Sequence, residues 1–236
     1  MTATDIMLHL QNLGQESYKK ILLKHGICEP LYGVKIEELK KIAKKEKDGY
    51  ALSLELWDTG IYDARYLAGL LTEPTKMLPA DLQHWAETAN APVLRESTVA
   101  WVASESLHGW AKAMEWIGTG NADLSSSGWA TLGDLVAITS DAALDIIALG
   151  TLLERVAATI HQSANREKLT QNGFIIAVGT YVKPLHAAAL AAAARVGKVT
   201  ADMGDTACKI PDAAEYISKA VAKNTVGKKR KSARCL

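Results

Sequence analysis

Residues 144–160 read LDIIALGTLLERVAATI, and their apolar side chains recur every three or four positions. The residues on this repeat are Leu144, Ile147, Ala148, Leu152, Val156 and Ile160. A period of about 3.6 residues places them on one face of an amphipathic helix. We therefore expect a helix here, with Ser140 or Asp141 capping its start.

The same helical period recurs along most of the sequence, and no segment alternates apolar and polar residues for long enough to predict a sheet. The most strand-like run is 174–182, but Gly173 and Gly179 leave its structure open. Glycine and proline residues cut the chain into about twelve helices of roughly 10 to 20 residues. Antiparallel helix pairs that stack on one another would bury the apolar faces, so we predict an all-α fold.

We expect one domain over residues 1–222, followed by a basic, flexible tail over residues 223–236. Residues 200–210 (TADMGDTACKI) form the one long irregular segment before that tail. Asp202, Asp205 and Cys208 lie close together within it, and a structured turn explains them better than a metal site does.

Charge is unevenly distributed along the chain. The formal net charge is only +1, yet residues 223–236 hold six basic side chains and no acidic one. Nine lysines accompany four glutamates between Lys19 and Lys47. The lysines that fall on one side of a helix there are Lys40, Lys41, Lys44, Lys45 and Lys47. A polyanion is the commonest partner for such a distribution, although a solvated basic tail is an equally common explanation for residues 223–236 alone.

Several functional classes find no support in the sequence. No apolar run approaches the roughly 20 residues that a membrane span needs, and residues 1–10 do not resemble a secretory signal. The three cysteines and six histidines have no metal-binding spacing, and no glycine-rich phosphate loop is present. We therefore expect a cytoplasmic protein without a metal, cofactor or membrane partner. We also expect a monomer.

Short motifs spread over most of the chain resemble those of one family. They are Tyr32-Gly33-Val34, Leu39-Lys40-Lys41, Leu54-Glu55-Leu56-Trp57, Gly60-Ile61-Tyr62-Asp63-Ala64-Arg65, Asn172-Gly173-Phe174 and Gly227-Lys228-Lys229-Arg230-Lys231. These motifs resemble the DNA alkylation repair proteins of the AlkC/AlkD type. The resemblance implies a curved superhelix (solenoid) of HEAT/armadillo-like helix pairs, with a concave, positively charged face that holds double-stranded, alkylated DNA. Active members cleave the glycosidic bond of N3- and N7-alkylated purines without drawing the base into a tight pocket.

Such a glycosylase must stabilise positive charge on the deoxyribose, because an alkylated purine is already a good leaving group. A carboxylate does so directly, and a tryptophan face attracts the same cation. Glu105 follows Trp101 by four residues, so both side chains share a helix face. The spacing is close to that of the tryptophan and catalytic aspartate in the resembled family, which makes Trp101 and Glu105 the candidate catalytic residues. A half-buried tryptophan beside a surface glutamate is the competing interpretation.

Two further aromatic residues are candidates for a platform against the alkylated base. The resembled family has a second tryptophan late in the chain and an arginine between the two tryptophans. This sequence has Tyr181 near the first of these positions and residues 125–129, ending in Trp129, around the second. Trp129 also precedes Asp134, but five helical residues turn by about 140°, so these two side chains diverge. Trp129 and Tyr181 are the candidate aromatic platform.

Phosphate contacts are expected from cations of the lysine-rich helix, of the tail and of the surface between them. The candidates are Lys40, Lys41, Lys44, Lys45, Arg95, Asn165, Arg166, Lys183, Lys228, Lys229, Arg230, Lys231 and Arg234. For each of the isolated positions, an ordinary exposed polar side chain is the alternative.

Three functions remain open at the level of sequence. The first, which we expect from the sequence, is an alkylpurine DNA glycosylase of base-excision repair that is associated with the nucleoid when it binds DNA. The second is a non-catalytic module on the same scaffold that binds damaged or branched DNA, which the absent late tryptophan favours. The third is a protein-interaction scaffold, because fold alone does not fix function. A DNA-binding titration paired with a base-release assay separates them.

Overall fold

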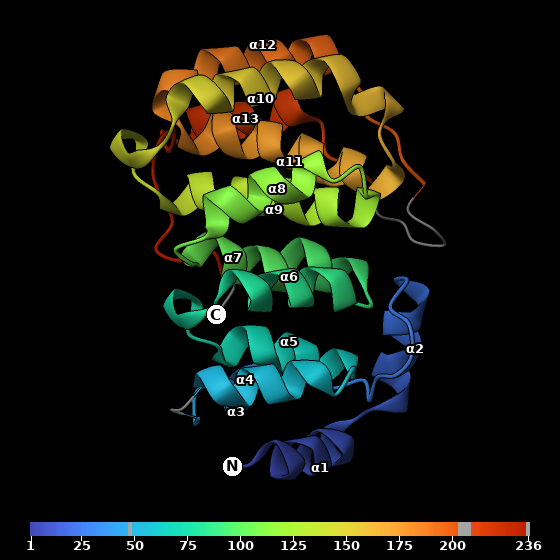
Figure 1. Ribbon diagram of the computed structural model, residues 1–236. Helices are drawn as coiled ribbons and strands as arrows, with labels where there is room; N and C mark the ends of the chain where they lie inside the picture. Colours follow the sequence, from blue (N-terminus) through green and yellow to red (C-terminus); the bar gives the residue numbers. More distant parts are fainter. Residues whose placement is uncertain (47–48, 203–208, 235–236) are drawn as a thin grey trace. The chain divides into compact units, whose positions relative to one another are not determined.

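The computed structural model describes residues 1–46, 49–202 and 209–234, and every regular element in these ranges is helical. Figure 1 traces the thirteen α-helices of the described residues, which confirms the all-α prediction of about twelve. Lys47, Asp205, Cys208 and Cys235 lie outside the described residues. The helices are α1 Ala3–Leu13, α2 Glu16–Lys24, α3 Ile36–Ala43, α4 Gly49–Asp58, α5 Tyr62–Leu71, α6 Pro79–Thr88, α7 Ala100–Glu105, α8 Gly109–Gly118, α9 Ala122–Ile138, α10 Ile146–Thr159, α11 Asn165–Tyr181, α12 His186–Val196 and α13 Ala213–Ala222.

The chain divides into two compact units. The first contains described residues 1–108 together with Arg234, and the second contains 109–202 and 209–233. Each unit has its own core. The single domain expected over residues 1–222 stays a prediction.

Helix α10 occupies the segment that led to the helical prediction, but its cap differs from the one expected. Asp145 is the N-cap residue, and its Oδ1 accepts a hydrogen bond from the Ala148 N–H at 2.9 Å. Ser140 and Asp141 instead begin a short 3₁₀ turn, because α10 starts only at Ile146. The buried residues of α10 are Leu149, Leu152, Leu153 and Val156, whereas Ile147 in its first turn is exposed.

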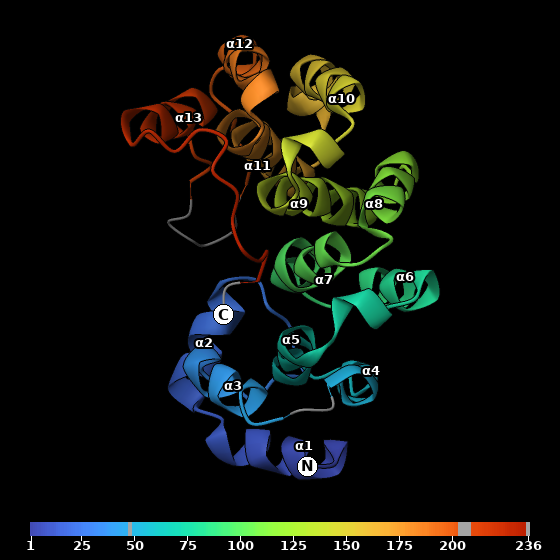
Figure 2. The same cartoon turned by 90° about the vertical axis from the view of Figure 1, so that its left-hand side faces the viewer.

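The second unit is built around α9, which packs against both α8 and α11 (Figure 2). Trp129 of α9 and Phe174 of α11 are fully buried, with ring centroids 5.2 Å apart. Residues 174–181 of the strand-like run lie within α11 and are helical, and Val182 is the extended residue that ends the helix. Gly179 allows this helix to approach α13, since an added Cβ would lie 2.5 Å from Cδ1 of Ile217. The glycine that made the sequence ambiguous therefore serves helix packing.

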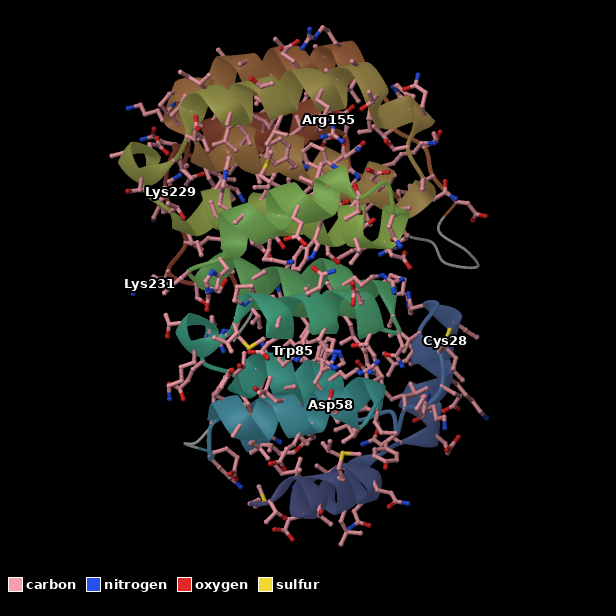
Figure 3. All side chains as sticks on the ribbon, viewed as in Figure 1. Cys28, Asp58, Trp85, Arg155, Lys229 and Lys231 are labelled. Atoms are coloured by element: carbon pink, nitrogen blue, oxygen red, sulfur yellow. The ribbon has the colours of Figure 1, made fainter. Side chains whose placement is uncertain are left out.

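The first unit is organised by stacked tryptophans. The rings of Trp57 on α4 and Trp85 on α6 lie parallel, 6° apart in plane, with centroids separated by 4.2 Å. Trp85 is labelled in Figure 3. The Arg65 guanidinium lies 5.3 Å from the Trp57 ring and donates to the carbonyl oxygens of Trp57 and Thr88. This arginine therefore joins α4, α5 and the end of α6.

A buried carboxylate fixes the loop before α3. Asp63 accepts backbone N–H bonds from Tyr32 at 2.6 Å, Gly33 at 3.4 Å and Val34 at 2.7 Å. Burial raises the pKa of Asp63, while the three N–H donors act in the opposite direction. Gly33 has φ +78°, and a Cβ there would lie 2.7 Å from that of Lys19. The Tyr32-Gly33-Val34 motif and Asp63 thus hold the fold together.

Candidate nucleic-acid interface

Helix α3 presents a cationic face, as the sequence predicted. Leu39 and Ile42 are buried, whereas Lys41, Lys44 and Lys45 are exposed and Lys40 is half-buried. The Lys41 ammonium is paired with Glu38 at 2.6 Å. The other three lysines have no ion-pair partner in the described part of the chain. They are therefore available to a polyanion, and their contact with DNA stays a prediction.

Trp101 on α7 lies inside the first unit. Its indole is buried and meets the Tyr66 ring edge-on, with a centroid distance of 5.6 Å and an interplanar angle of 89°. An indole packed in this way exposes little of either face, so a base has no platform there. The environment of Trp101 therefore fits the competing interpretation, in which this tryptophan serves packing and not catalysis.

The Glu105 carboxylate is held by Arg234, the last described residue. The Arg234 Nε and Nη2 atoms both lie 3.1 Å from Glu105 Oε2. Only 13% of the Arg234 side chain and 17% of the Glu105 side chain are exposed. A carboxylate neutralised by a guanidinium contributes far less field to a developing cation than an unpaired one would. Trp101 and Glu105, the predicted catalytic pair, therefore lie on one helix as expected. However, the indole is buried and the carboxylate is paired with Arg234.

The same guanidinium caps the end of α5. Arg234 Nη1 donates to the carbonyl oxygens of Gly69, Leu70 and Thr72 at 3.4, 3.2 and 3.1 Å. Carbonyl groups at a helix C-terminus lack helical partners and carry the negative end of the helix dipole, so a cation stabilises them. Arg234 was predicted to contact phosphate, but these groups already occupy it.

The basic tail is also held along helix ends in the second unit (Figure 2). The Gly227 N–H donates to Thr180 O at the end of α11, and the Arg230 N–H donates to Ala137 O near the end of α9, both at 2.8 Å. Ala233 is fully buried. Residues 227–233 thus follow the C-terminal ends of α11 and α9. The flexibility expected of residues 223–236 stays a prediction.

Two cations of the tail, Lys229 and Arg230, already have partners within the second unit. Lys229 Nζ donates to Val136 O at 2.9 Å and lies 2.8 Å from an oxygen of Asp141. Arg230 Nη1 lies 3.7 Å from Asp134 Oδ1. The predicted phosphate roles of Lys229 and Arg230 therefore compete with existing partners. Lys229 and Lys231 are labelled in Figure 3.

Fewer cations of the second unit are exposed and without an ion pair among the described residues than the sequence indicated. Lys183, Lys228 and Lys231 are exposed and have no ion-pair partner among the described residues. Asn165 is exposed and Arg166 half-buried at the start of α11. In the first unit, Arg95 is half-buried and its Nη1 donates to Ala89 O at 2.6 Å.

The predicted aromatic platform is not open to a base. Trp129 is fully buried against Phe174, with the Arg155 guanidinium 5.7 Å from its ring. Its indole N–H has no hydrogen-bond partner among the described residues. A base could reach this ring only if α9 and α11 separated, so the platform role assigned to Trp129 is not supported. Tyr181 is half-buried and packs against the same core.

Neither a metal site nor a simple membrane span emerges from the described residues. They contain no group of three metal-ligating side chains. No single helix in the described ranges is long and apolar enough to cross a membrane. The segments Asn165–Tyr181 and Lys183–Val196 together pass that test on length and composition, but they bend by 112° and belong to the core of the second unit.

The structure therefore defines an all-helical protein of paired helices with several open lysines. Comparison with known proteins gives the family. The family described as DNA alkylation repair enzyme matches residues 6–217, and the chain belongs to it. An uncharacterised protein of Listeria monocytogenes is 33% identical over 226 residues, which cover 93% of this chain and 97% of the relative. A second uncharacterised protein, from Listeria innocua, is 32% identical over the same lengths.

A solved structure establishes the HEAT-like fold. It covers 100% of both chains with a TM-score of 0.92 and 35% sequence identity. That protein is described as one of a new family related to the HEAT-like repeat DNA glycosylases, with affinity for branched DNA structures. The resemblance noted in the sequence is thus confirmed.

Proposed function

We propose that this protein binds branched DNA through contacts to the phosphate backbone and does not excise bases. Membership of the DNA alkylation repair family and the solved relative with affinity for branched DNA support a DNA partner. The open lysines of α3 supply sequence-independent contacts of the kind that phosphates need.

The Glu105–Arg234 contact is the observation that carries the non-catalytic part of this proposal. Excision requires an anionic group facing the sugar as the glycosidic bond breaks. Glu105 is mostly buried, faces a guanidinium at 3.1 Å, and is one turn from an indole that is itself buried. This arrangement supports the fold of the first unit better than it supports bond cleavage.

Alkylpurine glycosylase activity is the second candidate, because the family as a whole is described as a repair enzyme. It would require Arg234 to leave Glu105 when DNA binds. The two functions differ in one observable quantity, the release of free base.

A paired experiment separates the two candidates. Binding to a four-way junction and to a linear duplex of the same sequence is measured by fluorescence anisotropy, and release of N7-methylguanine from methylated duplex is measured alongside it. We expect salt-dependent binding, tighter to the junction, with base release at the protein-free rate. Base release above that rate by the wild type, but not by Glu105→Gln, would establish the glycosylase instead.

Lysine variants test whether α3 makes the backbone contacts. Replacing Lys40, Lys44 and Lys45 together by alanine is expected to reduce the slope of log affinity against log salt by up to about 3, since each phosphate contact contributes about 0.9. Lys76→Ala is the matched control, because Lys76 is also in the first unit but is paired with Glu73 at 2.9 Å. Equal slopes for the triple variant and the wild type would exclude α3 from the interface.

A further inference from the structure

Helix α2 has an outward face that packing within the described chain does not explain. Of its nine residues, Glu16–Lys24, only Leu22 is buried. A helix this short is marginal in water unless a packed face stabilises it. Most of its side chains face outward, where a binding partner could contact them.

The exposed stripe combines two free cations with an apolar side chain. Ser17, Lys20, Ile21 and Lys24 follow one another at helical spacings of three, one and three residues, so they share a face. Ile21 is 50% exposed between the two lysines. Lys20 and Lys24 have no ion-pair partner in the described ranges, unlike Lys19, which binds Glu29 at 2.7 Å.

This combination fits a DNA branch point better than an uninterrupted duplex. In a continuous duplex the flat faces of the base pairs are stacked on one another, and only phosphates and groove edges are accessible. Where strands exchange, the face of the last base pair of an arm can open, and apolar side chains are the groups that proteins insert at unstacked steps. Lysines next to the inserted apolar side chain can then bind the neighbouring phosphates.

We propose that α2 reads the branch point: Ile21 lies against the open face of a terminal base pair, and Lys20 and Lys24 bind the phosphates beside it. The stripe itself holds two cations, and Glu16 lies one turn before Lys20, so this side of α2 keeps a net positive charge that complements a polyanion. This inference rests on the proposed function, and it adds the element that distinguishes branched from linear DNA.

The test compares affinities for a four-way junction and for a linear duplex of the same sequence. Ile21→Ala is expected to weaken junction binding by about tenfold while duplex binding stays within about twofold. The double variant Lys20→Ala, Lys24→Ala is expected to weaken both by similar factors. Leu8→Ala, in α1 of the same unit and 62% exposed, is the matched control and should change neither.

A second variant keeps the test independent of any loss of helix. Ile21→Lys retains a good helix former and adds a cation, so duplex affinity should rise while the preference for the junction falls. A wild type that prefers the junction, with the same preference in Ile21→Ala and Ile21→Lys, would overturn the role of α2 alone. A wild type without any junction preference would overturn the proposed function as well. The two failures are therefore distinguishable.

Discussion

Replacement of Arg234 by alanine is expected to destabilise the first unit, although this residue is third from the end of the chain. The change removes a guanidinium that pairs with Glu105 and donates to three carbonyl oxygens at the end of α5. It also leaves the Glu105 carboxylate without the cation that faces it at 3.1 Å.

The magnitude follows from burial. Removal of one partner from a fully buried ion pair costs about 3–5 kcal/mol, whereas an exposed pair contributes about 0–1 kcal/mol. With 13% and 17% of the two side chains exposed, the Arg234–Glu105 pair lies nearer the buried limit. We expect a loss of about 2–3 kcal/mol in the free energy of unfolding. At an m-value of about 2 kcal/mol/M, the urea midpoint would fall by roughly 1 M.

Urea unfolding followed by tryptophan fluorescence measures this loss, because Trp101 lies one turn before Glu105. Arg195→Ala is the matched control: Arg195 pairs with Glu154 at the shorter distance of 2.7 Å, but 53% and 63% of those side chains are exposed. The control is expected to lose much less stability than Arg234→Ala, because solvent screens an exposed ion pair. The shorter ion pair should therefore be the weaker one.

The result that would refute this reasoning is a loss below about 0.5 kcal/mol for Arg234→Ala, or a loss equal to that of the control. A double-mutant cycle with Glu105→Ala sharpens the test. We expect a coupling energy of about 1–3 kcal/mol between the two side chains, and additive single losses would show that the contact does not stabilise the fold.

Three further outcomes follow from particular contacts. Asp63→Asn is expected to lower the free energy of unfolding by about 2–3 kcal/mol, since the amide cannot accept all three N–H bonds; urea titration measures this, and a loss under 1 kcal/mol would contradict it. Gly69→Ala places a Cβ against the Cγ2 methyl of Thr98, so a loss of about 1–3 kcal/mol is expected, and an unchanged melting temperature would show that α5 can shift. Lys229→Ala should reduce stability by about 1–2 kcal/mol while Lys231→Ala reduces only DNA affinity; the reverse result would mean that the tail contacts are not structural.

Much of the fold could be predicted because it depends on local patterns. The helical period of residues 144–160 and the lysine face of α3 are both visible along the chain and confirmed in the structure. The cap of α10 was misplaced because Ser140, Asp141 and Asp145 are all suitable caps, and only the backbone path decides between them.

The site was harder to predict because its contacts join residues far apart in sequence. Arg234 and Glu105 are separated by 129 positions, so nothing in the local pattern indicates that they pair. Composition identifies the tail as basic, but it does not show whether a lysine binds a phosphate or a carbonyl group at a helix end. A phosphate is anionic and such a carbonyl carries a partial negative charge, so both attract a lysine. The exposure of Ile21 could not be predicted, because Ile21 begins the apolar run Ile21-Leu22-Leu23 and the sequence does not show that Leu22 is the buried member of the three.

The account depends most on the claim that this protein binds DNA for its branched shape and leaves the bases in place. Competition between an unlabelled four-way junction and an unlabelled linear duplex of identical sequence, for wild-type protein bound to a labelled junction at about 0.15 M salt, measures that claim directly. The account predicts that the junction displaces the label at a concentration at least about tenfold lower than the duplex does. Equal displacement by the two DNAs, or no binding to the labelled junction at all, would contradict it.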